Sequence, residues 1–108
     1  MKISIRDVNG YKVVDLDGNL DTTSAPNLEA EMDKLVASNV NKIVVNLKDL
    51  NYVSSSGLRV FLKTAKQMVP MKGSFRLCEP NETVKDILKI SGFDTIIQVF
   101  DTLDMATE

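Results

Sequence analysis

The sequence contains no histidine, no tryptophan and only one cysteine, Cys78. Without histidine, neither a serine–histidine nor a cysteine–histidine catalytic pair can form within the chain, so a hydrolase with an activated nucleophile is disfavoured. One cysteine allows neither an internal disulfide nor a cysteine metal cluster, and we expect Cys78 to be a buried or strand-end thiol. The sequence also lacks a glycine-rich phosphate loop, a dinucleotide-binding fingerprint and any metal-ligand spacing. We therefore expect a protein that is not an enzyme and needs no cofactor or metal.

Long apolar runs and an excess of basic charge are missing as well. No stretch approaches the ~20 apolar residues of a membrane span, and residues 1–7 alternate polar and apolar side chains instead of forming a signal peptide. The net charge of −2 provides no basic surface for nucleic acid. With 108 residues, 44% of them hydrophobic and 26% charged, the chain has the size and composition of one globular domain over 1–108. We expect a cytoplasmic protein that binds neither membrane nor nucleic acid.

Hydrophobic periodicity predicts five strands and four helices. The first two strands, 2–8 and 11–17, flank the two-residue hairpin turn Asn9-Gly10. The other expected strands are 42–48, 74–78 and 95–100, and the expected helices are 23–38, 55–69, one from Asn81 to a stop at Gly92, and a short one ending near 107. Because strand–helix–strand units give parallel pairs, the order predicts an α/β fold. We expect a mostly parallel mixed sheet with an antiparallel N-terminal edge strand and about four helices.

The serine loop, Ser54-Ser-Ser-Gly57, lies between an apolar strand and an amphipathic helix. One serine is expected to cap this helix, because its oxygen accepts a hydrogen bond from a free amide of the first turn. The free N–H groups and the dipole at a helix start also tolerate a phosphate. Carboxyl ends of parallel strands share one edge of a sheet, so the turn Gly18–Asp21 should lie beside the serine loop. The apolar stripe of the helix, all assigned to the core, is Leu58, Phe61, Leu62, Ala65, Met68 and Val69.

In order and length these residues resemble a STAS domain, and specifically the bacterial anti-sigma factor antagonists. The resemblance covers nearly all 108 residues. Gly18-Asn-Leu-Asp21 is similar to the family pattern Gly-x-Leu-Asp, and Val53-Ser-Ser-Ser-Gly-Leu58 is similar to apolar-Asp-Ser-(Ser/Thr)-Gly-Leu. The segments Val45–Leu50 and Ser91-Gly92-Phe93 extend it. Two positions depart from the pattern: Ser54 replaces the usual Asp, although it can still cap the helix, and Arg59 replaces a residue that is often Gly.

The resemblance implies a partner switch. The unphosphorylated chain would bind an anti-sigma factor that is also its ATP-binding serine kinase, and would thereby release a sigma factor. Phosphorylation would abolish this binding, and a serine phosphatase would restore it. The family motif points to Ser55 as the acceptor, with Ser54 and Ser56 as secondary candidates. The implied partner-binding residues are Asp21, Thr22, Ser54, Ser56, Gly57 and Arg59, and the free chain is expected to be a monomer.

Electrostatic magnitudes favour a phosphate that controls docking rather than folding. Phosphoserine carries about −1.5 to −2 charges, and a helix N-terminus stabilises them by only ~0.3–1 kcal/mol. Burying the dianion in an interface without a cation costs several kcal/mol, and about 4 kcal/mol corresponds to about a thousandfold in affinity. Arg59, four residues after Ser55, either pairs with the phosphate or is simply solvated. Lys63 and Lys66 belong to a solvated face of the helix that is also able to contact a partner.

Other readings of the acidic residues and of the serine loop stay open. Asp21 either borders the kinase-binding surface or only satisfies turn amides at the start of the first helix. A response regulator with Asp15 or Asp17 as phosphate acceptor is disfavoured, because both residues lie within a strand and are more simply its solvated side. Two rival functions are a STAS adaptor subunit of a transport or signalling complex that is never phosphorylated, and a small enzyme that uses the Ser55 loop.

Overall fold

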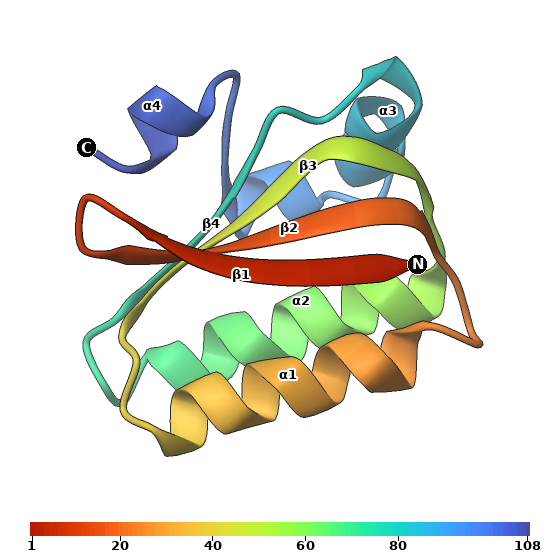
Figure 1. Cartoon of the computed structure of the whole chain (residues 1–108). Coiled ribbons are helices and arrows are strands. Elements are labelled where there is room, and N and C mark those ends of the chain that lie inside the picture. The colour runs from red at the N-terminus through yellow and green to blue at the C-terminus, as the bar shows by residue number, and fades with distance from the viewer.

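A five-stranded sheet forms the centre of the structure, a computed structural model that describes residues 1–108 (Figure 1). Its strands stand side by side in chain order: β1 (Lys2–Val8), β2 (Tyr11–Leu20), β3 (Lys42–Val53), β4 (Ser74–Cys78) and β5 (Gln98–Phe100). β1 pairs antiparallel with β2, and every other neighbouring pair is parallel. The predicted mixed α/β sheet with an antiparallel N-terminal edge strand is therefore confirmed.

Four helices cover the two faces of this sheet. α1 (Ala25–Ala37) and α2 (Ser55–Met68) lie next to each other on one face, and α3 (Glu82–Ile90) and α4 (Leu103–Ala106) lie on the other (Figure 1). A short 3-10 turn, η1 (Phe93–Thr95), follows α3. None of these helices has the length and apolar content needed to traverse a bilayer.

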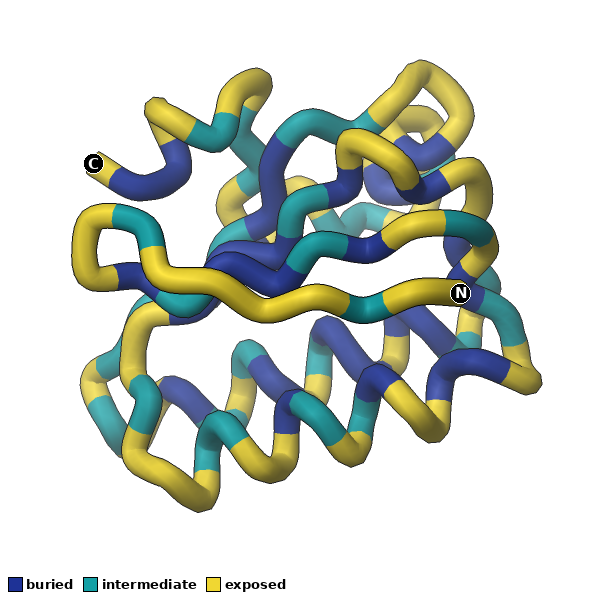
Figure 2. The backbone as a smooth tube through the Cα atoms, viewed as in Figure 1, coloured by how far each residue is buried: buried dark blue, intermediate teal, exposed yellow.

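The larger core joins the sheet to α1 and α2, and it also includes Val84 and Leu88 of α3. Figure 2 shows buried residues along the sheet-facing sides of both helices and exposed residues along their outer sides. Phe61 of α2 is fully buried, and its ring centroid lies 6.3 Å from that of Phe75 on β4. Alternation along the strands places a smaller cluster on the opposite face, near α4. Its members are Tyr11, Val13, Val44, Cys78 and Ala106, so the expected burial of the Cys78 thiol is confirmed.

Three strand boundaries differ from the sequence-based expectation. β2 continues to Leu20 and β3 to Val53, because the two strands stay paired through two register shifts. Glycine and asparagine at 18–19 therefore lie within a strand and not in a turn. The predicted strand 95–100 is wrong at its start, since only Gln98–Phe100 is extended. Gly92 adopts a left-handed conformation with φ of 78°, and the chain then forms η1 instead of a longer strand.

The buried face of α2 also differs at its C-terminal end. Val69 is 72% exposed, so its assignment to the core is wrong. It follows the last helical residue. Leu62 is only half-buried and lines a surface hollow, so its assignment to the core is wrong too, and Ala65 is half-buried against the core. Besides the expected Leu58, Phe61 and Met68, α2 buries Val60 and Thr64. The Thr64 hydroxyl donates to the carbonyl of Val60 over 2.9 Å. Because this bond satisfies the hydroxyl, a polar side chain fits in the core without an unpaired group.

Candidate functional site

The serine loop follows β3 directly and lies beside the end of β2. The Ser54 amide donates to the Leu20 carbonyl over 2.8 Å, which adds one bond beyond the last paired residues of the two strands. Two residues further along each loop, the hydroxyls of Thr22 and Ser56 lie 3.4 Å apart. The expectation that the two loops lie close together is confirmed, and its cause is the parallel pairing of β2 with β3.

The three serines of the loop have different environments. Ser54 has an extended backbone, and its Oγ accepts a hydrogen bond from the Gly57 amide over 3.2 Å, so it is the N-cap of α2. Ser56 is half-buried and contacts Thr22. Ser55, between them, is exposed in the first turn of α2, and its hydroxyl has no hydrogen-bond partner within the chain. Among the three hydroxyls, that of Ser55 is the one an approaching protein reaches without breaking an internal bond.

Gly57 holds the start of α2 against the sheet. A Cβ atom at this position would lie 2.5 Å from Leu20 Cγ and 2.9 Å from Val53 Cγ2, which is far inside van der Waals contact. Only glycine therefore allows the helix to approach the ends of β2 and β3 this closely. Because Gly57 is buried, it positions the loop and presents no surface of its own to a partner.

Asp21 satisfies the amides of the turn that leads into α1. Its Oδ1 accepts from the backbone amides of Thr23 and Ser24 over 3.0 and 2.9 Å, and the Ser24 hydroxyl accepts from the Asp21 amide over 2.9 Å. The bond from the Ser24 amide is the main reason why the pKa of Asp21 lies below its ordinary value. Ser24 occupies the N-cap position, but its hydroxyl donates to the Asn19 carbonyl of β2 over 2.9 Å and does not cap the helix amides. The structure thus shows the turn-forming role of Asp21, while its Oδ2 accepts no bond.

A groove of about 520 Å³ runs between the N-terminal halves of α1 and α2. Thr22, Ser56 and Arg59 all line it, so the structure brings these three predicted site residues together. Lys63, deeper along the groove, contacts Glu29 Oε2 at 3.0 Å and Asp33 Oδ1 at 3.3 Å. The hydrogen bond to Glu29 contributes most to raising the pKa of Lys63. Arg59 makes no ion pair within the chain and is exposed.

The bridge from Lys63 to α1 was missed from the sequence, where we assigned this lysine to a solvated face. The available signal was the acidic pair itself. Glu29 and Asp33 are four residues apart and therefore share one face of α1. That face meets α2 only because both helices lie on the same side of the sheet, which periodicity alone does not determine.

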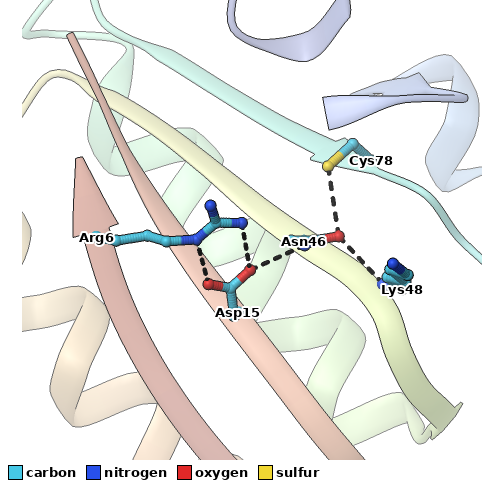
Figure 3. A network of polar contacts seen from close by, with 5 residues as sticks. All are labelled: Arg6, Asp15, Asn46, Lys48 and Cys78. Atoms are coloured by element: carbon cyan, nitrogen blue, oxygen red, sulfur yellow. Dashed lines mark hydrogen bonds and ion pairs between the residues drawn. The ribbon is translucent and has the colours of Figure 1, made fainter. Parts of the chain in front are cut away.

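A second polar network crosses the other face of the sheet (Figure 3). Asp15, Asn46 and Cys78 are in register on β2, β3 and β4. Arg6 Nε donates to Asp15 Oδ2 over 2.7 Å, and Asn46 Nδ2 donates to Asp15 Oδ1 over 2.8 Å. The Asn46 Oδ1 accepts from the Lys48 amide over 3.2 Å and from the Cys78 thiol over 3.7 Å. Asp15 is thus half-buried and bonded on both sides, and not simply a solvated residue as the sequence suggested.

The ionisation of this network follows from its partners. Burial raises the pKa of Asp15, but hydrogen bonds from Arg6 and Asn46 and the charge of Arg6 outweigh it, so the pKa lies below its ordinary value. Burial raises the pKa of Cys78 to about 12, which keeps the thiol neutral. The structure contains no group of three or more side chains able to hold a metal ion. The network therefore reads as structural support for the sheet.

These features define a small α/β module in which an exposed serine lies in the first turn of a helix and no base lies beside it. The chain belongs to the STAS domain family, which matches residues 2–106. It is 35% identical over 106 residues to the "Putative anti-sigma factor antagonist BtrV" of Bordetella bronchiseptica, covering 98% of this chain and 91% of the relative. It is 31% identical over 86 residues to the anti-sigma-B factor antagonist of Bacillus subtilis, covering 80% and 78%.

A solved structure supports the same assignment. The crystal structure of an anti-sigma factor antagonist from Mycobacterium paratuberculosis superposes with a TM-score of 0.89 at 25% identity, covering 97% of this chain and 89% of the other. The resemblance to anti-sigma factor antagonists is therefore confirmed. These relatives are regulatory binding proteins, which also confirms the expectation that the chain is not an enzyme.

Proposed function

We propose that the chain is an anti-sigma factor antagonist that acts by partner switching. In the unphosphorylated form it binds an anti-sigma factor that is also its ATP-binding serine kinase, and a sigma factor is released. Phosphorylation of Ser55 abolishes the complex, and a serine phosphatase restores it. The names of the relatives support the antagonist role, and the switch would operate in the cytoplasm on a chain that is monomeric when free.

The exposed, unbonded hydroxyl of Ser55 is the observation that carries this proposal. Ser54 is a poorer acceptor because it is less exposed than Ser55 and its Oγ already accepts from the Gly57 amide. Ser56 is half-buried against Thr22, where a dianion would need desolvation. A phosphate on Ser55 would instead project into solvent at the positive end of α2, so the fold is expected to tolerate it. The consequence of the added charge would then fall on the partner that covers this edge.

The surface proposed for the partner consists of the residues around Ser55. It includes the free carboxylate oxygen of Asp21, the exposed Thr22 and Arg59, and the edges of Ser54 and Ser56. Thr22, Ser56 and Arg59 share the groove between α1 and α2, which gives the partner a concave contact. Gly57 supports this surface from beneath.

Co-expression with a candidate kinase from the same genome tests the acceptor directly. Intact-mass measurement should show one added phosphate on the wild type and on Ser54→Ala and Ser56→Ala, but none on Ser55→Ala. Pull-down with the same kinase should recover the unmodified chain and not the phosphorylated one. Phosphate incorporation into Ser55→Ala, or equal recovery of both forms, would exclude the switch as proposed.

Arg59 is proposed to pair with the phosphate on Ser55. Residues four apart on a helix share a face, and Arg59 is not engaged by any carboxylate of the chain. An adjacent cation favours the dianion and lowers the second phosphate pKa. Phosphorus NMR titration should therefore give a higher phosphoserine pKa in Arg59→Ala than in the wild type, whereas Lys66→Ala should leave it unchanged. Equal pKa values in Arg59→Ala and the wild type would leave Arg59 as a solvated side chain.

The alternative function is a STAS adaptor subunit that is never phosphorylated. The serine at position 54 favours it, because the loop lacks the carboxylate that the family pattern places next to the acceptor. The same co-expression experiment separates the two functions. A chain that stays bound to its partner without any gain of phosphate would be an adaptor.

A further inference from the structure

α2 is unusual in this acidic chain because it carries cations and no carboxylate. Its sequence from Ser55 to Met68 contains Arg59, Lys63 and Lys66 but neither Asp nor Glu, although the net charge of the chain is −2. A shallow hollow of about 470 Å³ lies against this helix. It is lined by Arg59, Leu62, Lys63, Lys66 and Gln67. Every charged residue of the hollow is therefore positive.

The hollow continues the groove at the serine loop. The two share Arg59 and Lys63, and the groove reaches Thr22 and Ser56 at its other end. From Ser56 to Gln67 the helix advances by about 16 Å, or three turns. A single helical segment of a partner is long enough to contact both.

The cations of the hollow differ in what they already bind. Lys63 is held by two carboxylates of α1. Arg59 and Lys66, on either side of it, make no ion pair within the chain. Two positive charges are therefore available to an incoming anion, spaced seven residues apart on one helix. A nucleic-acid-binding surface makes about six to ten phosphate contacts, so two free cations are too few for such a surface.

Leu62, the apolar residue of the hollow, indicates the kind of anion that fits. Leu62 adds an apolar contact, which suits a protein segment better than a free inorganic ion.

We propose that this hollow binds an acidic amphipathic helix of the protein partner, with carboxylates at Arg59 and Lys66 and an apolar side chain on Leu62. The inference rests on the proposed function, since it describes how the anti-sigma factor would recognise α2. It also explains why a phosphate at Ser55 disrupts docking. The phosphate lies one turn before Arg59, so it competes for that cation and repels the acidic segment at the end of the hollow.

A designed peptide tests the hollow without knowledge of the partner. The probe is a helical 18-residue peptide of glutamate and leucine in amphipathic order, and its control carries glutamine in place of every glutamate. Fluorescence anisotropy with the full chain should show binding of the acidic peptide that is at least about tenfold tighter than that of the control and weakens with salt. Lys66→Glu should weaken it at least about fivefold, because one attraction becomes a repulsion.

A matched charge variant and lipid vesicles test whether the peptide binds specifically to the hollow. Lys85→Glu makes the same charge change on the exposed face of α3, outside the hollow, and it should leave peptide binding unchanged. Thermal unfolding should show that both charge variants are folded. Equal effects of Lys66→Glu and Lys85→Glu, equal binding of the two peptides, or binding only to vesicles that contain phosphatidylserine would overturn the inference.

The cognate anti-sigma factor separates failure of this inference from failure of the proposed function. If phosphorylation abolishes its binding but Lys66→Glu binds as tightly as the wild type, the hollow is not part of the interface and the switch stands. If the partner binds the phosphorylated and unmodified chains equally, the proposed switch is wrong. The peptide experiment then still tests whether the hollow binds an acidic helix. We expect both changes to weaken binding, and phosphorylation to have the larger effect.

Discussion

A methyl group added at Gly57 sets two known effects of opposite sign against each other. In a helix, alanine is favoured over glycine by about 1 kcal/mol. The added Cβ, however, would lie 2.5 Å from Leu20 Cγ, 2.7 Å from Leu20 Cδ2 and 2.9 Å from Val53 Cγ2. Carbon atoms prefer a separation of about 3.5–4.0 Å, so the methyl group is about 1 Å too close to all three. Neither neighbour can move into solvent, since Leu20 is 0% and Val53 2% exposed.

We therefore expect Gly57→Ala to destabilise the protein. Overpacking a core by one methyl group costs ~1–3 kcal/mol, and after subtraction of the helix-propensity gain the net loss should be about 1 kcal/mol. Urea unfolding of the wild type, Gly57→Ala, Leu20→Ala and the double variant measures this loss and assigns its cause. Leu20→Ala alone should cost ~2–5 kcal/mol. In the Gly57→Ala background it should cost about 1 kcal/mol less, because it removes two of the three close contacts.

The comparison of these four proteins can also refute the steric argument. Suppose that Gly57→Ala is as stable as the wild type and that the effects of the two substitutions add within about 0.5 kcal/mol. Helix propensity then determines the stability of Gly57→Ala, and the close packing of α2 on β2 is refuted. A confirmed loss also predicts slower phosphorylation of Ser55, because the start of α2 must move away from the sheet to accept the methyl group. Lys85→Glu, which keeps the glycine and lies outside the serine loop, is the folded comparison for that measurement.

Three further predictions concern the cap, the sheet network and the thiol. Ser54→Ala should lower the free energy of unfolding by about 1 kcal/mol through loss of the bond to the Gly57 amide, while Ser54→Asp should not, as urea unfolding would show. The low pKa of Asp15 means that its carboxylate stabilises the fold above the unfolded-state pKa of about 4, and that this contribution is lost as pH falls through the folded pKa. The stability difference between wild type and Asp15→Asn should therefore shrink on acidification, and a constant difference would contradict the assignment. Cys78 should react with a thiol reagent at about pH 8 only as fast as the protein opens, in contrast to the unfolded chain, because it is buried and its pKa is about 12.

The order and type of the elements could be predicted because the core imposes clear periods on the sequence. β-branched runs alternate or continue over five to eight residues, and the helices repeat apolar residues at three and four. One strand prediction failed where tertiary pairing overrode local preference, and another failed where a local side-chain bond did so. Gly18 and Asn19 favour a turn, yet they remain in β2 because β3 is long enough to pair with them. At 95–97 the β-branched residues favour a strand, but the Thr95 hydroxyl bonds to the Gly92 carbonyl over 2.7 Å and closes a helical turn.

The candidate site was predictable to the level of its loops but not of its atoms. Parallel order alone predicted that the loops after β2 and β3 would meet, and the Ser54–Gly57 motif marked a helix start. The sequence could not say which serine caps, because that depends on the extended backbone of Ser54. It also could not show that Lys63 is engaged by α1 whereas Arg59 is free, since this depends on how the two helices lie against each other.

The loop separates its structural and surface roles on successive residues. A helix turns by about 100° per residue, so neighbouring side chains in the first turn point in different directions. Ser54 turns inward to cap, Gly57 packs on the sheet, and Ser56 contacts Thr22. Ser55 is left with no structural role. A charge added at Ser55 should therefore meet little resistance from the fold, and in the proposed switch its free-energy cost would arise only when another protein covers the same edge, which is the property that a reversible docking switch requires.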